Sequence, residues 1–187
     1  MDMFKKELLT IVSGSFLLWK GQTIMKNRND QKKYPKTISG FQGTYYFLSN
    51  FYPAPVSYMG QIYANSEAAF QAQKTLSAKE RQRFGMFRMH SAAEAKKLGK
   101  KLELRPDWEK IKLQCMYEIC MCKFMQNPDL RKALLDTGSC ILVEENTWGD
   151  SFWGTVNGYG ENQLGQILMD IRAKLQWDLT IVNTQYV

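Results

Sequence analysis

A glutamate and a lysine seven residues apart form a pair of side chains that could do chemistry. They are Glu67 and Lys74, in the stretch SNFYPAPVSYMGQIYANSEAAFQAQK. The spacing predicts a helix over 67–76, and a rotation of about 100° per residue places both on one side. A buried carboxylate can act as a general base, and an amine can attack a carbonyl or bind phosphate. The alternative is a solvated helix face, because the helix dipole also favours a carboxylate in the first turn.

A second group lies in EENTWGDSFWG, where a predicted strand ends in a loop with two glycines. Asn146, Trp148, Asp150 and Trp153 are its polar and aromatic members. Loops that leave strands often carry sites. The rings could stack on a planar base while the carboxylate meets a sugar hydroxyl or a developing positive charge. The alternative is a turn anchored by tryptophan, in which the aspartate bonds to its own backbone.

Three further residues have an ordinary structural interpretation. Trp108 falls in line with Ile111, Cys115, Ile119 and Cys122, which is typical of a core stripe. His90 precedes a predicted helix, where a contact in the cap region is favoured over catalysis. Asn162 stands at the start of the last predicted helix, where it either caps the helix or presents amides to a phosphate.

The sequence predicts neither a metal nor a cofactor. It has four cysteines and one histidine, without paired C-x-x-C spacing or a second histidine. No GxGxxG follows a predicted strand, and no Walker lysine is present, so we expect no dinucleotide-binding or P-loop fold. Three of the cysteines lie in one apolar helical segment, which indicates buried, reduced thiols and a cytoplasmic protein.

The positive charge is concentrated near the N-terminus. Residues 1–36 hold eight Lys or Arg against three acidic residues, which is most of the net charge of +7. We therefore predict a basic extension and linker over 1–37, either a solvated tail or a contact with phosphates. Its apolar stretch is far shorter than the roughly 20 residues that span a bilayer and lacks a small-x-small cleavage site, so we expect no membrane anchor.

Residues 38–187 are predicted to form one α+β domain, mainly helical with a small β-sheet. TYYFL reads as a strand, and residues 54–64 as a hairpin turned at Met59-Gly60. Predicted helix caps are Ser66, Ser77, Ser91 and Asp107. The capped helices are followed by a helix from Pro128 that closes at Gly138, a buried strand CILVEE, and a helix over about 162–176. That last helix carries apolar residues at helical spacing, namely Leu164, Ile167, Leu168, Ile171 and Leu175.

Six segments in register resemble the NADAR family, also called YbiA-like, from about Phe41 to Arg172. They are the stretch quoted at the opening, DWEKIK, MCKFMQNPDLRKALLDTG, LVEEN, DSFWG and GENQLGQILMDIR. The resemblance implies a YbiA-like fold and an enzyme that hydrolyses the bond between C1 of a ribose and a nitrogen. The first expected substrate is ADP-ribose attached to guanine in DNA or RNA. The alternatives are a ribosylamino-pyrimidine phosphate of riboflavin synthesis, and a module that binds ADP-ribose or NAD-derived nucleotides without hydrolysis.

The resemblance also implies roles for individual residues. The family's glutamate and lysine fall on Glu67 and Lys74, and its D-x-x-W-G motif on Asp150 and Trp153. We expect Glu67, Asp150 and Lys74 to be catalytic, with Lys74 either a Schiff-base nucleophile or a phosphate binder. The residues expected to bind substrate are Trp108, Trp153, Asn50, Phe51, Asn146, Gly154 and Asn162. Trp148 and Gly149 lengthen the loop relative to the family pattern.

Overall fold

The structure is a computed structural model that describes residues 36–184, without the side chains of 182–184. The predicted basic extension, apart from its last two residues, lies outside this part of the chain. The described elements, in chain order, are β1 (Thr37–Ser39), the 3₁₀ helix η1 (Gly43–Leu48), β2 (Val56–Tyr58), β3 (Gln61–Tyr63), α2 (Ser66–Ala72), α3 (Ala78–Gln82), α4 (Ala92–Gly99), α5 (Trp108–Gln126), α6 (Pro128–Asp136), β4 (Ile141–Val143) and α7 (Gln163–Thr184).

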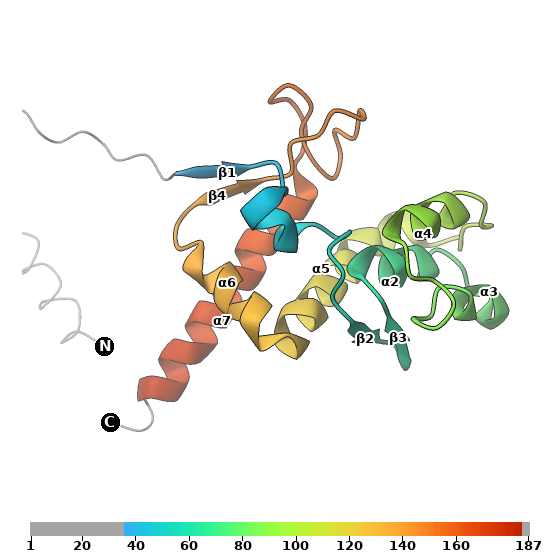
Figure 1. Cartoon of the computed structure of the whole chain (residues 1–187), viewed down its shortest axis with the longest axis horizontal. Coiled ribbons are helices and arrows are strands. Elements are labelled where there is room, and N and C mark those ends of the chain that lie inside the picture. The colour runs from blue at the N-terminus through green and yellow to red at the C-terminus, as the bar shows by residue number, and fades with distance from the viewer. Residues whose placement is uncertain (1–35, 185–187) are drawn as a thin grey trace, which may run out of the picture. The chain divides into compact units, whose positions relative to one another are not determined.

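The strands of the described residues form two small sheets of two strands each. β1 runs parallel to β4, with Ile38 opposite Leu142, and the two lie side by side in Figure 1. β2 and β3 form the predicted antiparallel hairpin. Its turn residues have positive φ, 50° at Met59 and 77° at Gly60, as a two-residue type I′ turn requires. The α+β prediction is confirmed, with helices making up most of the regular structure.

The prediction of a strand at TYYFL was wrong. These residues belong to η1, in which Leu48 is buried while Tyr45 and Tyr46 are exposed. Strand propensity is realised only where a neighbouring strand supplies hydrogen bonds, and within residues 36–184 no strand pairs with this segment. The aromatic residues therefore form a tight helical turn, after which the chain continues through Ser49 and Asn50.

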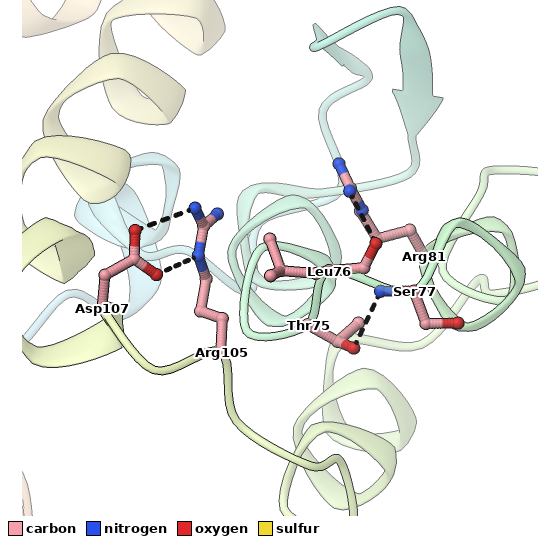
Figure 2. A network of polar contacts seen from close by, with 6 residues as sticks. All are labelled: Thr75, Leu76, Ser77, Arg81, Arg105 and Asp107. Atoms are coloured by element: carbon pink, nitrogen blue, oxygen red, sulfur yellow. Dashed lines mark hydrogen bonds and ion pairs between the residues drawn. The ribbon is translucent and has the colours of Figure 1, made fainter.

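Ser77, Ser91 and Asp107 are the N-cap residues of their helices, as predicted, whereas the cap predicted at Ser66 was wrong. The hydroxyl groups of Ser77 and Ser91 accept hydrogen bonds from the third amide of α3 and α4. In α2 the cap is Asn65, whose side chain accepts from Ala68 N–H at 2.9 Å, and Ser66 is already helical. Asp107 makes no side-chain cap, because its carboxylate is held by the guanidinium of Arg105 at 2.6 and 3.1 Å (Figure 2).

α2 ends earlier than the predicted helix, so Lys74 lies in the turn that follows it. The Thr75 hydroxyl accepts from Ser77 N–H at 3.2 Å, and Arg81 donates to the Leu76 carbonyl at 3.0 Å (Figure 2). Local side-chain bonds of this kind compete with helix continuation. Arg105 N–H donates to the Lys74 carbonyl at 2.8 Å, which fastens the turn to the segment before α5.

The core lies between the long helices, with α2 enclosed against α4 and α5. All seven residues of α2 are buried, although the sequence left a solvated face open for this helix. Small residues make this possible, because a Cβ on Gly99 of α4 would come within 1.8 Å of Gln71 Oε1. The five apolar residues predicted for the last helix are all buried, and α7 continues beyond the predicted end to Thr184. No helix within residues 36–184 has the length and apolar character to cross a membrane.

Candidate active site

A cavity of about 590 Å³ lies between the segment after η1, α2, α4 and the loop after β4. Its volume is in the range of small-molecule and nucleotide sites. Eight of the ten residues assigned to the site from the sequence line it: Asn50, Phe51, Glu67, Lys74, Asn146, Asp150, Trp153 and Gly154. Trp108 and Asn162 do not line it. Within the described residues, no group of three His, Cys, Asp or Glu side chains is arranged to hold a metal.

Glu67 is buried in the wall of this cavity, with 6% of its surface exposed. Its backbone N–H donates to the Asn50 carbonyl at 3.0 Å, and its Oε1 accepts from Gln71 Nε2 at 2.8 Å. Burial raises the pKa of Glu67, while the bond from Gln71 and the ammonium groups of Lys96 and Lys74 lower it. The backbone of Glu67 is thus held by Asn50 and its carboxylate by Gln71, and burial makes the carboxylate more basic than one in water.

Lys74 lies seven residues further on, against aromatic rings. Its Nζ is 5.9 Å from the ring centroid of Phe70 and 5.8 Å from that of Trp108. Burial lowers the pKa of Lys74, and the nearby Glu67 carboxylate raises it. Trp108 itself is buried and packs on Phe70 with centroids 5.1 Å apart, so it lies behind the cavity wall. Trp108 therefore belongs to the core, as its helical spacing with other apolar residues indicates.

The loop after β4 is held by its own polar side chains. Asn146 Nδ2 donates to the carbonyls of Asp150 at 2.7 Å and Thr155 at 3.0 Å, while its Oδ1 accepts from Asp150 N–H at 3.0 Å. Asp150 Oδ1 accepts from Trp153 N–H at 2.9 Å. The predicted turn, in which the aspartate side chain bonds to nearby backbone, is therefore present. Within residues 36–184 the other Asp150 oxygen has no hydrogen bond, so it remains available to a ligand in the cavity.

Two residues assigned to substrate binding have their polar groups directed mainly at the protein. Asn50 donates to Met116 Sδ at 3.1 Å and accepts from Cys120 Sγ at 3.6 Å, both on α5. Asn162 Oδ1 accepts from Glu144 N–H and its Nδ2 donates to the Leu142 carbonyl, each at 2.9 Å. Asn50 thereby positions the start of α2, and Asn162 fixes the end of β4 to the start of α7.

Three charged residues of the cavity wall were missed by the sequence reasoning, namely Lys96, Glu144 and Glu145. Lys96 of α4 lies with its Nζ 5.7 Å from the ring of Phe51 and 5.8 Å from the ring of exposed Trp148. Glu144 follows β4, and burial together with the charge of Asp150 raises its pKa to about 7. Lys96 is one of several lysines on a helix with an ordinary polar pattern, so no local signal distinguishes it. The only signal for Glu144 was its place at the end of a predicted strand.

The model of the NADAR domain family matches residues 38–176. The chain is 39% identical over 145 residues to N-glycosidase YbiA of Shigella flexneri serotype 5b, covering 74% of this chain and 89% of that protein. It is 38% identical over 133 residues to riboflavin biosynthesis protein VVA0006 of Vibrio vulnificus, covering 70% of this chain but only 35% of that longer protein. The NMR structure of E. coli YbiA has a TM-score of 0.69 and 36% identity, covering 79% of this chain and 89% of that one.

The fold is thus a YbiA-like α+β domain, with a cavity bordered by α2, α4 and the loop after β4. The chain belongs to the NADAR domain family, since both the family model and relatives of similar length match most of it.

Proposed function

We propose that this protein is an N-glycosidase that hydrolyses the bond between ribose C1 and a nitrogen, with ADP-ribose on guanine in nucleic acid as its first substrate. The observation that carries the proposal is the meeting of Glu67 and Asp150 in one cavity walled by aromatic rings. Breaking a glycosidic bond passes through an oxocarbenium-like sugar, whose positive charge a carboxylate stabilises. Two carboxylates from distant segments that border one cavity suit that transition state.

In this mechanism Glu67 activates the water that adds to C1. Its raised pKa and its fixed orientation by Gln71 both favour proton abstraction. The unbonded oxygen of Asp150 orients the ribose hydroxyls near the same carbon. Phe70 and Trp153, whose ring centroids are 5.3 Å apart, form an apolar wall against which the sugar or base packs.

Two roles are open to Lys74, and they require different protonation states. The charged amine would bind a phosphate of the substrate, whereas the neutral amine would attack an opened sugar aldehyde and form a Schiff base. Burial lowers the pKa of Lys74 and so increases the neutral fraction. At the cavity mouth, the rings of Phe51 and Trp148 and the ammonium of Lys96 offer stacking and charge to a base and a phosphate.

A second substrate class is favoured by the names of the relatives. One is called a riboflavin biosynthesis protein and others N-glycosidase YbiA. Under this alternative the same carboxylates cleave the C1–N bond of a ribosylamino-pyrimidine phosphate. The chemistry at C1 is unchanged, and the difference lies in what occupies the mouth of the cavity.

The test is to incubate the protein with a guanine-ADP-ribosylated oligonucleotide and, separately, with a ribosylamino-pyrimidine phosphate, and to quantify free ADP-ribose or ribose phosphate. We expect turnover with the oligonucleotide. Turnover of the pyrimidine substrate alone would reassign the substrate class. Binding of ADP-ribose with no release in either assay would overturn the glycosidase proposal in favour of a binding module.

The matched variant for this test is Glu67→Gln. Glutamine keeps an oxygen that can accept from Gln71, so the pocket shape is retained while the base is lost. We expect turnover to fall by about 10² to 10⁴, the usual contribution of a general base, with ADP-ribose affinity within a few-fold of wild type. Full activity in this variant would remove Glu67 from the mechanism.

A further inference from the structure

Glu144 is held at the end of β4 by its backbone. Its N–H donates to Asn162 Oδ1 at 2.9 Å, and its carbonyl accepts from Thr155 N–H at 2.8 Å. Gly154 packs on the same carbonyl so closely that a Cβ there would lie 2.1 Å from the oxygen. The backbone of Glu144 therefore has little freedom, and the residue borders the cavity from a fixed point.

Within residues 36–184 the carboxylate of Glu144 accepts no hydrogen bond, in contrast to that of its neighbour. Its Oε2 is buried and, among the residues that the structure describes, receives no hydrogen bond. Glu145 also borders the cavity, but it accepts from the Thr155 hydroxyl and from Gly158 N–H. A buried carboxylate oxygen without a hydrogen-bond donor disfavours the charged form, so this oxygen favours a Glu144 carboxyl group that keeps its proton.

The charges around Glu144 come from several elements. Asp150, on the loop after β4, opposes ionisation of Glu144, and Lys96 of α4 favours it. Glu67 and Lys74, from α2 and the turn after it, border the same cavity. Burial is the largest influence, and the pKa of Glu144 is raised to about 7. The group is therefore partly protonated at neutral pH, as a proton donor must be.

We propose that Glu144 is the general acid of this site, which delivers a proton to the departing nitrogen while Glu67 serves the incoming water. This inference rests on the proposed glycosidase function. The C1–N bond breaks and its electron pair goes to nitrogen, which takes the proton of the Glu144 carboxyl group. Water adds to C1 and loses a proton to Glu67, and exchange with solvent returns both groups to their starting states. The route through a Schiff base on Lys74 needs the same proton on nitrogen.

Leaving-group dependence tests this role. We would compare wild type, Glu144→Gln and Glu67→Gln on the guanine-ADP-ribosylated oligonucleotide and on the 4-nitrophenyl glycosides of ADP-ribose and of ribose 5-phosphate. Because 4-nitrophenolate departs without protonation, Glu144→Gln should lower kcat/KM about 10² to 10⁴-fold for the oligonucleotide. For the nitrophenyl glycosides the loss in kcat/KM should be less than about tenfold. Glu67→Gln should lose activity on both.

The pH profile gives an independent readout. Wild-type kcat/KM for the oligonucleotide should fall as pH rises through about 7, where Glu144 loses its proton. This alkaline limb should be missing from Glu144→Gln. Glu145→Gln is the matched control, since it should change neither the ratio between the two kinds of substrate nor the alkaline limb.

The possible failures are distinguishable. If wild type cleaves none of these substrates, nor the ribosylamino-pyrimidine phosphate, the glycosidase proposal fails. If wild type is active but Glu144→Gln is equally active, or loses the same factor on the oligonucleotide and the nitrophenyl glycosides, the acid role of Glu144 is overturned while the glycosidase proposal stands.

Discussion

At the scale of single residues, burial pushes the pKa values of Glu67 and Lys74 toward each other. Desolvation raises the pKa of the acid and lowers that of the base, and the attraction between the two charges opposes both changes. Such paired perturbation within a cavity is common among catalytic groups. It also means that a change at either residue alters the protonation of the other.

Substitution of Lys74 by arginine distinguishes a role as nucleophile from a role in binding phosphate. Arginine keeps a cation for phosphate but cannot form a Schiff base. We expect Lys74→Arg to reduce turnover more than about 100-fold with substrate affinity preserved, since an activated nucleophile is the group that a lowered pKa favours. Borohydride treatment of the wild type during turnover should add a ribosyl mass at Lys74, measured by peptide mass spectrometry. If Lys74→Arg retains activity and no adduct is trapped, Lys74 binds phosphate and is not a nucleophile.

At the scale of elements, the packing of α4 on α2 controls the electrostatics of the cavity. Gly99 allows the two helices to approach closely at Gln71, the residue that holds the Glu67 carboxylate. The same approach brings Lys96 of α4 to the cavity wall. In Figure 1 the two helices lie side by side, apart from the pair formed by β1 and β4.

Enlarging Gly99 should therefore damage activity through Gln71. In Gly99→Ala the new methyl group would overlap Gln71 Oε1, which cannot move without weakening its bond to Glu67. We expect a loss of about 1–3 kcal/mol in unfolding free energy and a fall in kcat larger than any change in KM. Ala93→Gly, at an exposed position on the same helix, is the control: it costs about 1 kcal/mol in helix stability but should leave kcat unchanged. Equal kinetic effects in both variants would argue against this coupling.

At the scale of the whole domain, buried cations connect segments far apart in the chain. Lys123 of α5 donates to the carbonyls of Phe47 and Ser49 at 2.6 and 2.8 Å, next to the segment that positions Glu67. Arg172 of α7 donates to the Thr137 hydroxyl at 2.6 Å and the Cys140 carbonyl at 2.8 Å. Each cation satisfies carbonyl or hydroxyl oxygens that would otherwise be buried without partners.

Lys123 should make the stability of the domain depend on pH above 8. Burial lowers the pKa of Lys123 to about 8, below its ordinary value of 10.5. Between these values Lys123 is more protonated in the unfolded chain than in the folded one, so its contribution to the free energy of unfolding should rise with pH, by at most about 3 kcal/mol. Urea unfolding at several pH values from 7.5 to about 10.5 measures this slope, relative to Lys123→Met, in which the contribution is lost. Lys97→Met, at an exposed position of α4, controls for removal of a charge. A slope in Lys123→Met equal to that of the wild type would contradict the assignment.

Local patterns in the sequence accounted for much of the architecture. The hairpin turn at Met59-Gly60, the caps at Ser77 and Ser91 and the buried stripe of α7 depend on neighbours within a few residues, so they can be read from spacing. The strand predicted at TYYFL failed because a strand needs a partner from elsewhere in the chain. Asp107 takes the predicted N-cap position, but its carboxylate bonds to Arg105 and not to a helix amide.

The chemistry of Glu67, Lys74 and Asp150 was suggested by residue types, spacing and family resemblance, but which side chains meet was visible only in the folded chain. Lys96 and Glu144 border the same cavity because α4 packs on α2 and β4 pairs with β1. A sequence records neighbours along the backbone, whereas burial, pKa values and unpartnered oxygens depend on distances across it. The orphaned carboxylate of Glu144 is therefore a property of the packed domain that no motif in the chain records.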